Sequence, residues 1–81
     1  MEPLIALDVA LGGVIRDSRG KLSQAEFGAK VGWVQKKVSL VEAGKQPVSF
    51  TEMDRIAAVL GKDPLEMIAE AYARYRRSIS G

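Results

Sequence analysis

Apolar residues recur at intervals of three and four along most of the chain, which is the spacing that one face of an α-helix requires. With their capping residues, the segments that show this pattern are 4–18, 23–31, 34–43, 49–60 and 64–78. Connections of about two to five residues join them, and such short connections keep consecutive helices adjacent. The pattern therefore predicts a compact all-α fold of five helices.

Specific residues mark where these helices start and end. Ser23 and Glu26 have the spacing of a capping box, in which a serine side chain and a glutamate three residues later bond to each other's backbone N–H groups. Ser49 and Glu52 repeat this signal, and Asp63 is a good cap for the last helix. Glycine ends helices because it adopts positive φ without strain, and it follows the first four segments as Gly20, Gly32, Gly44 and Gly61.

The join between the second and third predicted helices is very short. Only Val31, Gly32 and Trp33 are available to turn the chain. Two short helices joined this closely must cross steeply, as in a helix-turn-helix, whose second helix enters the major groove of DNA. An ordinary corner between two helices has the same outline, so the geometry alone leaves both interpretations open.

Composition narrows the possible functions. The chain has 81 residues, 47% apolar and 27% charged, as expected for a single soluble domain spanning 1–81. Cysteine and histidine are absent, which removes disulfides, thiolate and imidazole chemistry and the usual zinc ligands. We therefore expect no cofactor, no metal and no catalytic residue, and an enzyme is the least supported class. With no membrane-length apolar run and no signal peptide in the sequence, a cytoplasmic protein is expected.

Basic residues are concentrated in one part of the chain. Residues 16–45 contain seven bases and three acids, so this segment carries +4 while the whole chain carries +2. A surface that faces phosphate groups would show such an excess, and so would an ordinary solvated face. The charge distribution is therefore compatible with nucleic-acid binding and does not by itself require it.

An ordered set of residues along this region resembles one protein family. The set is the stretch Leu22-Ser-Gln-Ala-Glu-Phe-Gly-Ala-Lys-Val-Gly32 followed by Gln35, Val38-Ser39, Glu42, Gly44, Ile56-Ala57 and Leu60-Gly61. It resembles the XRE family of helix-turn-helix transcriptional regulators, which includes the lambdoid phage repressors and Cro and, among short members, controllers of restriction-modification operons. The likeness covers 16–61. It implies a lambda-repressor-like domain that binds a double-stranded DNA operator of two half-sites as a homodimer.

The resemblance also implies a set of DNA contacts. Gln24 takes the place of a glutamine that meets a phosphate, and Gln35 stands at the head of the third, recognition helix, where a glutamine can bond bidentately to adenine. Lys36 and Lys37 follow on the same exposed side, where each can reach guanine or a phosphate. Lys45 takes a position that contacts the DNA backbone. The full predicted contact set is Ser23, Gln24, Trp33, Gln35, Lys36, Lys37, Ser39, Leu40 and Lys45.

Three positions of the turn and recognition helix have an unusual residue for this family. Trp33 either covers the turn as a core residue or points its indole N–H toward a phosphate. Leu40 either touches a thymine methyl group or is an ordinary surface residue. Val34 stands where the family usually has serine or threonine, so the recognition helix lacks a side-chain cap, at a cost of about 1 kcal/mol.

Two further expectations concern how the domain holds together. Arg16 and Glu42 match positions that the family joins in a structural salt bridge. The last helix, 64–78, carries an apolar stripe, to which Met67 and Ala71 also belong, that is longer than its own domain can cover, so a second copy is expected to bury it. The alternative is that this helix simply folds back on its own core. The predicted dimer residues are Leu65, Ile68, Tyr72 and Tyr75.

Two functions of different classes follow. The first is a homodimeric, sequence-specific DNA-binding regulator of transcription. The second is a protein-interaction module, such as an antitoxin that masks a toxin, in which Trp33, Leu40 and the last helix form the binding patch and DNA binding is secondary. The basic segment 16–45 favours the first, because a pure protein binder has no need of it.

Overall fold

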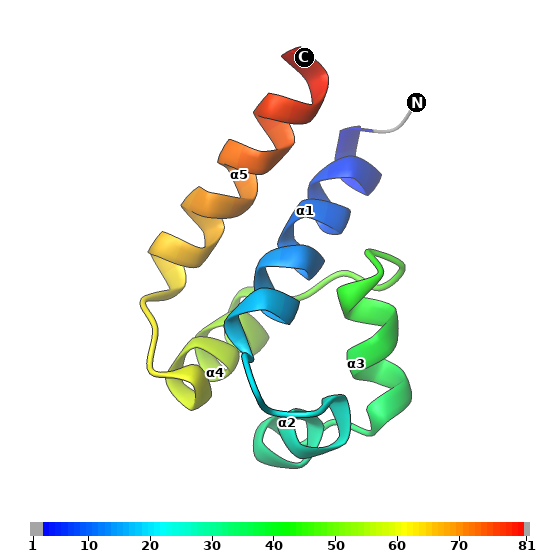
Figure 1. Ribbon diagram of the computed structural model, residues 1–81, viewed down its shortest axis with the longest axis vertical. Coiled ribbons are helices and arrows are strands. Elements are labelled where there is room, and N and C mark those ends of the chain that lie inside the picture. Colours follow the sequence, from blue (N-terminus) through cyan, green and yellow to red (C-terminus); the bar gives the residue numbers. More distant parts are fainter. Residues whose placement is uncertain (1–2, 81) are drawn as a thin grey trace.

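A computed structural model describes the backbone of residues 3–80 and the side chains of residues 7–79. Over this part of the chain it contains five helices and no strand, which confirms the predicted all-α fold (Figure 1). The helices are α1 Pro3–Ser18, α2 Gln24–Val31, α3 Gln35–Glu42, α4 Phe50–Leu60 and α5 Pro64–Ser80. None of these helices combines the length and the apolar character that a membrane span requires.

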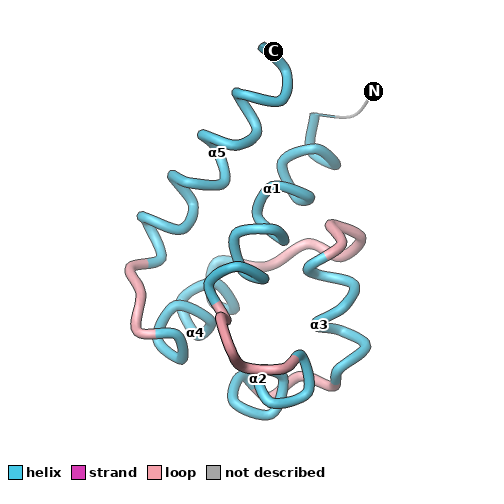
Figure 2. The backbone as a smooth tube through the Cα atoms, in the orientation of Figure 1, coloured by secondary structure: helices cyan, strands magenta, loops and turns pink. Residues whose placement is uncertain are grey.

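The two longest helices and the three shorter ones form different parts of the molecule. α1 and α5 pack side by side and run in opposite directions, so the beginning of α1 and the end of α5 lie at the same end of the molecule (Figure 1). α2, α3 and α4 gather at the other end, where α2 packs on both α3 and α4 (Figure 2). α3 also packs against α1, so the antiparallel pair supports the shorter helices.

Both predicted capping boxes are present. The Ser23 hydroxyl accepts the Glu26 backbone N–H at 3.0 Å, and the Glu26 carboxylate accepts the Ser23 N–H at 2.8 Å. Ser49 and Glu52 make the same pair of bonds at 3.1 and 2.9 Å. Val34 precedes α3 without a side-chain cap, as the sequence predicts. The local signals therefore place these three helix starts correctly.

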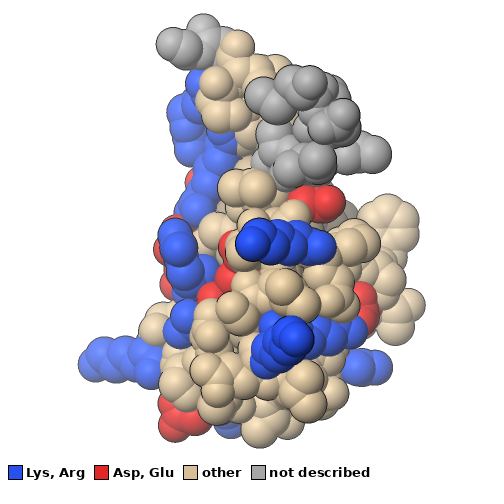
Figure 3. Space-filling view, turned by 90° about the vertical axis from the view of Figure 1, so that its right-hand side faces the viewer, with Lys and Arg blue, Asp and Glu red and all other residues tan. Residues whose placement is uncertain are grey.

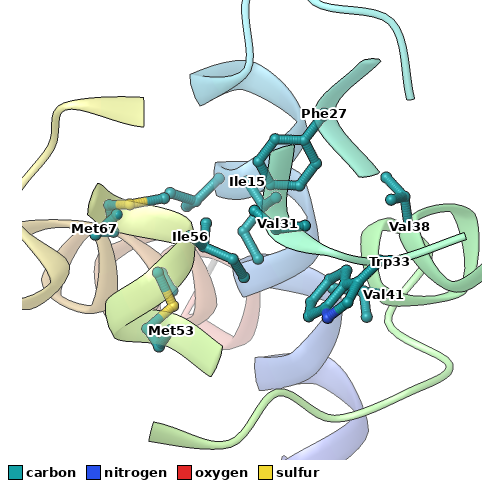
Figure 4. Close-up of a cluster of buried hydrophobic side chains, with 12 residues drawn as sticks. Ile15, Phe27, Val31, Trp33, Val38, Val41, Met53, Ile56 and Met67 are labelled. Atoms are coloured by element: carbon teal, nitrogen blue, oxygen red, sulfur yellow. The ribbon is translucent and has the colours of Figure 1, made fainter. Parts of the chain in front are cut away.

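The core lies where all five helices meet. Its largest fully buried side chains are Phe27, Ile15, Ile56, Val31, Val38 and Val41. Met53 of α4 and Met67 of α5 close the cluster from the other side (Figure 4). Full burial of an aliphatic or aromatic side chain contributes about 1.5–3 kcal/mol, so this cluster fixes how α2 and α3 sit on the rest of the domain.

Two glycines allow backbones to approach α3 and its turn closely. A Cβ atom at Gly12 would lie 2.5 Å from the carbonyl oxygens of both Val41 and Glu42, so α1 touches the end of α3 at this point. A Cβ atom at Gly28 would lie 2.5 Å from the carbonyl oxygen of Trp33. Any side chain at either position would push α3 or the turn outward.

Candidate nucleic-acid interface

Three residues, Gly32, Trp33 and Val34, connect α2 to α3. Gly32 takes φ 80° and ψ 27°, in the left-handed region, and the Trp33 N–H donates to the Gly28 carbonyl at 2.7 Å. Val34 then returns to extended backbone, and α3 begins. The two helices cross steeply as a result (Figure 2), which is the arrangement predicted from the short join.

α3 separates its exposed residues from its buried ones. Val38, Val41 and Glu42 are buried, whereas Gln35, Lys36 and Ser39 are exposed. At about 100° per residue, the three exposed positions fall within roughly one quarter to one third of the helix circumference. The predicted outward-facing surface of the recognition helix is therefore present. Leu40 lies at its edge, half-buried.

Lys37 does not share this surface, so the prediction that it lies on the same exposed side as Lys36 is wrong. Its side chain is 28% exposed, and its ammonium lies 2.7 Å from Oε2 of Glu52 on α4. The ammonium also lies 4.5 Å from the centre of the Trp33 ring. The hydrogen bond from Lys37, followed by that from the Ser49 backbone, holds the pKa of Glu52 below its usual value. Lys37 is turned away because it stands two positions after Gln35, about 200° around the helix.

Trp33 belongs to the core. It is 9% exposed and packs in the buried cluster beneath the turn, close to Val41 (Figure 4). Of its two predicted roles the core role is therefore the one observed, and the DNA contact assigned to it is corrected. The large apolar ring gains more from burial than its single N–H would gain from a phosphate.

The predicted salt bridge involves a different arginine. Glu42 is 8% exposed, and its carboxylate accepts two hydrogen bonds from Arg19, at 2.7 and 3.2 Å. Arg16 is exposed and its nearest acid is Asp17, at 4.0 Å, so the predicted Arg16–Glu42 pair is wrong. Arg19 lies one residue beyond the end of α1, and its backbone N–H still donates to the Ile15 carbonyl at 3.0 Å. It therefore lies on the same side as the buried Ile15, whereas Arg16 is about 100° around the helix from Ile15. The bond to Glu42 raises the pKa of Arg19.

The start of α2 also connects to Glu42. The Gln24 side chain is half-buried and donates from Nε2 to Glu42 Oε1 at 3.0 Å, so it links α2 to α3. The Ser23 hydroxyl is used by the capping box. The first backbone N–H groups of a helix have no carbonyl partner within it, and in α2 these include the N–H groups of Gln24 and Ala25. The Ser23 O–H and the second Nε2 hydrogen of Gln24 stay available as donors, so the phosphate contacts predicted for these two side chains stay predictions.

Not all seven basic side chains of segment 16–45 carry a charge that is free of a carboxylate partner. Three of its seven bases lie within 4.0 Å of a carboxylate: Arg16, Arg19 and Lys37. The other four are exposed and have no ion pair within the described part of the chain: Lys21, Lys30, Lys36 and Lys45. Figure 3 shows the side of the molecule where α3 lies, with basic side chains projecting from it and fewer acidic ones. Within segment 16–45, the positive charge that has no carboxylate partner in the described structure therefore comes from these four lysines.

The apolar stripe predicted on α5 consists of a buried set and an exposed set of residues in the structure. Met67 and Ala71 are buried against the core and Ile68 packs on it half-buried, so this side of α5 does fold back on its own domain. Leu65 and Tyr72 stay exposed, at 74% and 42%, and Tyr75 is half-buried. The four residues are therefore not one exposed face.

Among the described residues, sequence reasoning missed four exposed large apolar side chains, which are Val9, Val34, Phe50 and Ile79. Phe50 and Val34 are the most exposed of them. Phe50, the first residue of α4, is 87% exposed and borders a groove of about 160 Å³ together with Leu11, Val48 and Tyr72. Val34, just before α3, is 73% exposed. The spacing of apolar residues does not predict the exposure of Phe50. Phe50 directly follows the cap residue Ser49, before the buried face of α4 begins at Met53. For Val34, the sequence predicts only the lack of a side-chain cap on α3 and not its exposure.

Comparison with known proteins agrees with this geometry. A family model described as a helix-turn-helix domain matches residues 10–71, which include most of α1, all of α2, α3 and α4, and the first half of α5. No curated protein matches the chain.

Proposed function

Since the chain belongs to the helix-turn-helix domain family, we propose that it is a sequence-specific regulator of transcription that lays α3 in the major groove of double-stranded DNA. The observation that carries this proposal is the exposed surface of α3, where Gln35, Lys36 and Ser39 project together while Val38 and Val41 anchor the helix in the core. The major groove is about 12 Å wide and accepts such a helix.

Base recognition is assigned to the exposed residues at the start of α3. Gln35 can bond bidentately to the N6 and N7 atoms of adenine, and Lys36 can donate to N7 and O6 of guanine. Val34 offers an apolar side chain, 73% exposed, to a thymine methyl group. Ser39, one turn further along, can donate to or accept from either kind of base.

Phosphate contacts are assigned to groups around this surface. Lys21, Lys30 and Lys45 are exposed, and the first backbone N–H groups of α2 are further candidate donors to a phosphate. If each subunit neutralises about three or four phosphates, the logarithm of the affinity of a dimer falls against the logarithm of salt concentration with a slope of roughly −5 to −7.

The protein is proposed to act as a homodimer. Leu65 and Tyr72 on α5 and Phe50 on α4 are exposed apolar side chains, and Phe50 and Tyr72 border the same groove. A two-fold operator calls for a two-fold protein, and a second copy would bury this surface. Replacing Leu65 and Tyr72 by lysine is expected to yield a monomer in sedimentation equilibrium that binds a two-half-site operator at least about tenfold more weakly. A double variant that stays dimeric would contradict this interface.

The main test uses a duplex recovered from a random-sequence pool by the wild-type protein. Gln35→Ala is expected to cost about 1–3 kcal/mol on this duplex and little on random DNA, because a base contact carries sequence information. Lys45→Ala is the matched control, and it is expected to weaken binding to both duplexes equally. Equal losses on both duplexes for both variants would contradict the assigned roles, and failure to enrich any duplex would contradict sequence-specific binding.

The exposed apolar residues also support a second candidate function. Phe50 and Leu65, at 87% and 74% exposed, can anchor a different protein, such as a toxin that this chain masks. Trp33 no longer belongs to such a patch because it is buried. Measuring DNA retardation with and without the product of the neighbouring gene separates the two candidates, since a masking protein would need that product to act.

A further inference from the structure

Two adjacent lysines at the start of α3 have opposite surroundings. Lys36 is exposed and makes no ion pair in the described structure, whereas Lys37 reaches back to α4 and the turn. We propose that Lys37 is a positioning residue, which sets the pose of the recognition helix by joining it to Glu52 and Trp33 and does not contact DNA. This inference rests on the proposed function of α3.

The contacts of Lys37 tie α3 to an element on which it otherwise packs little. α3 packs mainly on α1 and α2. The hydrogen bond from Lys37 Nζ to Glu52 Oε2, at 2.7 Å, is the one side-chain bond between α3 and α4 in the described part of the chain. The same ammonium lies 4.5 Å from the centre of the Trp33 ring, so it contacts both the turn that precedes α3 and the start of α4.

The acceptor is itself fixed in place. Glu52 uses Oε1 to accept the Ser49 backbone N–H at 2.9 Å and Oε2 to accept Lys37. Its side chain is 25% exposed, comparable to the 28% of Lys37. Both carboxylate oxygens therefore have partners, and the carboxylate that receives Lys37 is held by the capping box of α4.

The start of α3 needs such a restraint. The helix has eight residues, and its N-cap Val34 supplies no side-chain bond to the first turn. Lys37 is the third residue of this turn, and it lies two positions after Gln35. A small rotation of the first turn would move Gln35 relative to a base edge, and hydrogen bonds weaken steeply when their angle is lost. The Lys37 bonds oppose that rotation from the opposite side of the helix.

The test compares a charge-neutral removal of the contact with removal of the neighbouring lysine. The double variant Lys37→Met with Glu52→Gln deletes one positive and one negative charge, and glutamine can still complete the capping box. Lys36→Met is the control for a lysine that faces DNA. Binding to the duplex selected from a random pool and to a random duplex is measured over a range of salt concentrations, at a temperature where circular dichroism shows every variant folded.

We expect the double variant to lower the ratio of selected to random binding about threefold to tenfold, with an unchanged salt slope. Lys36→Met is expected to reduce the steepness of the slope by about 0.9 per subunit. Lys37→Arg is expected to keep the wild-type ratio, because a guanidinium pairs with carboxylates and stacks on aromatic rings. If the double variant is unfolded, Glu52→Gln alone provides the same test with a smaller loss.

Two results would overturn the inference. One is a salt slope that falls in the double variant as much as in Lys36→Met, which would make Lys37 a phosphate contact. The other is an unchanged binding ratio with only a lower melting temperature, which would make the contact purely structural. If the wild-type protein selects no duplex at all, the proposed function fails, and this inference fails with it.

Discussion

The two ends of α3, the proposed recognition helix, are secured by different kinds of interaction. At the C-terminal end, Glu42 is 8% exposed and accepts bonds from Arg19 and Gln24. At the N-terminal end, Val34 gives no cap, and Lys37 bonds Glu52 at a site where both side chains are about one quarter exposed. Buried charges are costly when unpaired, and exposed pairs are worth little. The buried end should therefore govern stability, and the exposed end should govern the pose of the residues that are proposed to face DNA.

The largest effect is expected at the buried end. Arg19→Met would leave the Glu42 carboxylate buried without its main partner, and loss of one partner of a buried pair costs about 3 kcal/mol or more. Urea denaturation of the variant should show this loss as a lower midpoint at an unchanged m-value.

Arg16→Met is the matched control for this change. Arg16 is exposed and lies 4.0 Å from its nearest acid, so its replacement should change stability by less than about 0.5 kcal/mol. Replacing Arg19 and Glu42 together by methionine and leucine should recover most of the lost stability, because no charge then stays buried. Equal costs for Arg16→Met and Arg19→Met would contradict the asymmetry between these two arginines.

A smaller effect, of opposite sign, is expected at the exposed end. Val34 has the extended backbone of an N-cap residue, with φ −71° and ψ 156°, and is 73% exposed. Val34→Ser should therefore add a side-chain cap at little loss of burial and stabilise the domain by about 1 kcal/mol, or about 4–8 °C in melting temperature. Val34→Ala, which adds no cap, is the control and should leave the melting temperature nearly unchanged. A Val34→Ser variant that melts no higher than Val34→Ala would show that the first turn of α3 does not need a cap.

The sequence predicted best what local chemistry decides. The capping boxes at Ser23 and Ser49 and the positive φ of Gly32 depend on residues within a few positions of one another, and all are present. The same holds for the exposure of Gln35 and Lys36, which follows from helical periodicity once the turn is placed. The all-α fold and the helix-turn-helix assignment therefore needed no tertiary information.

The sequence did not predict which partners meet across the fold. Arg16 and Arg19 are three residues apart, and the position of each relative to the buried face of α1 decides which of them reaches Glu42. Helical spacing from Ile15 would have favoured Arg19, because a residue four positions later shares the buried face. The stripe on α5 had no such local signal. Its division into buried Met67 and exposed Leu65 depends on how α5 packs against α1, which periodicity cannot specify.

The smallest expected effect is the pH dependence of the stability that the Lys37–Glu52 contact contributes at the N-terminal end of α3. The bond from Lys37 and the Ser49 N–H hold the pKa of Glu52 below its ordinary value of 4.5 in the folded protein. A lowered folded-state pKa contributes stability above the unfolded-state value, and this contribution is lost as the pH falls through the folded-state value. Thermal melts from about pH 6 to about pH 3 should therefore show Glu52→Gln losing less stability on acidification than the wild type, by less than about 1 kcal/mol because the pair is partly exposed.

Glu26→Gln is the control, since Glu26 has the same capping-box role at α2 but no lysine bond, and its lowered pKa comes mainly from Ser23. The loss of stability on acidification should therefore be reduced, relative to the wild type, more in Glu52→Gln than in Glu26→Gln. Equal changes in the two variants would mean that the capping boxes alone set the pH response and that Lys37 adds nothing to it. A larger change at Glu52 would place the additional protonation-sensitive contact at the N-terminal end of α3, beside the turn that carries Gln35.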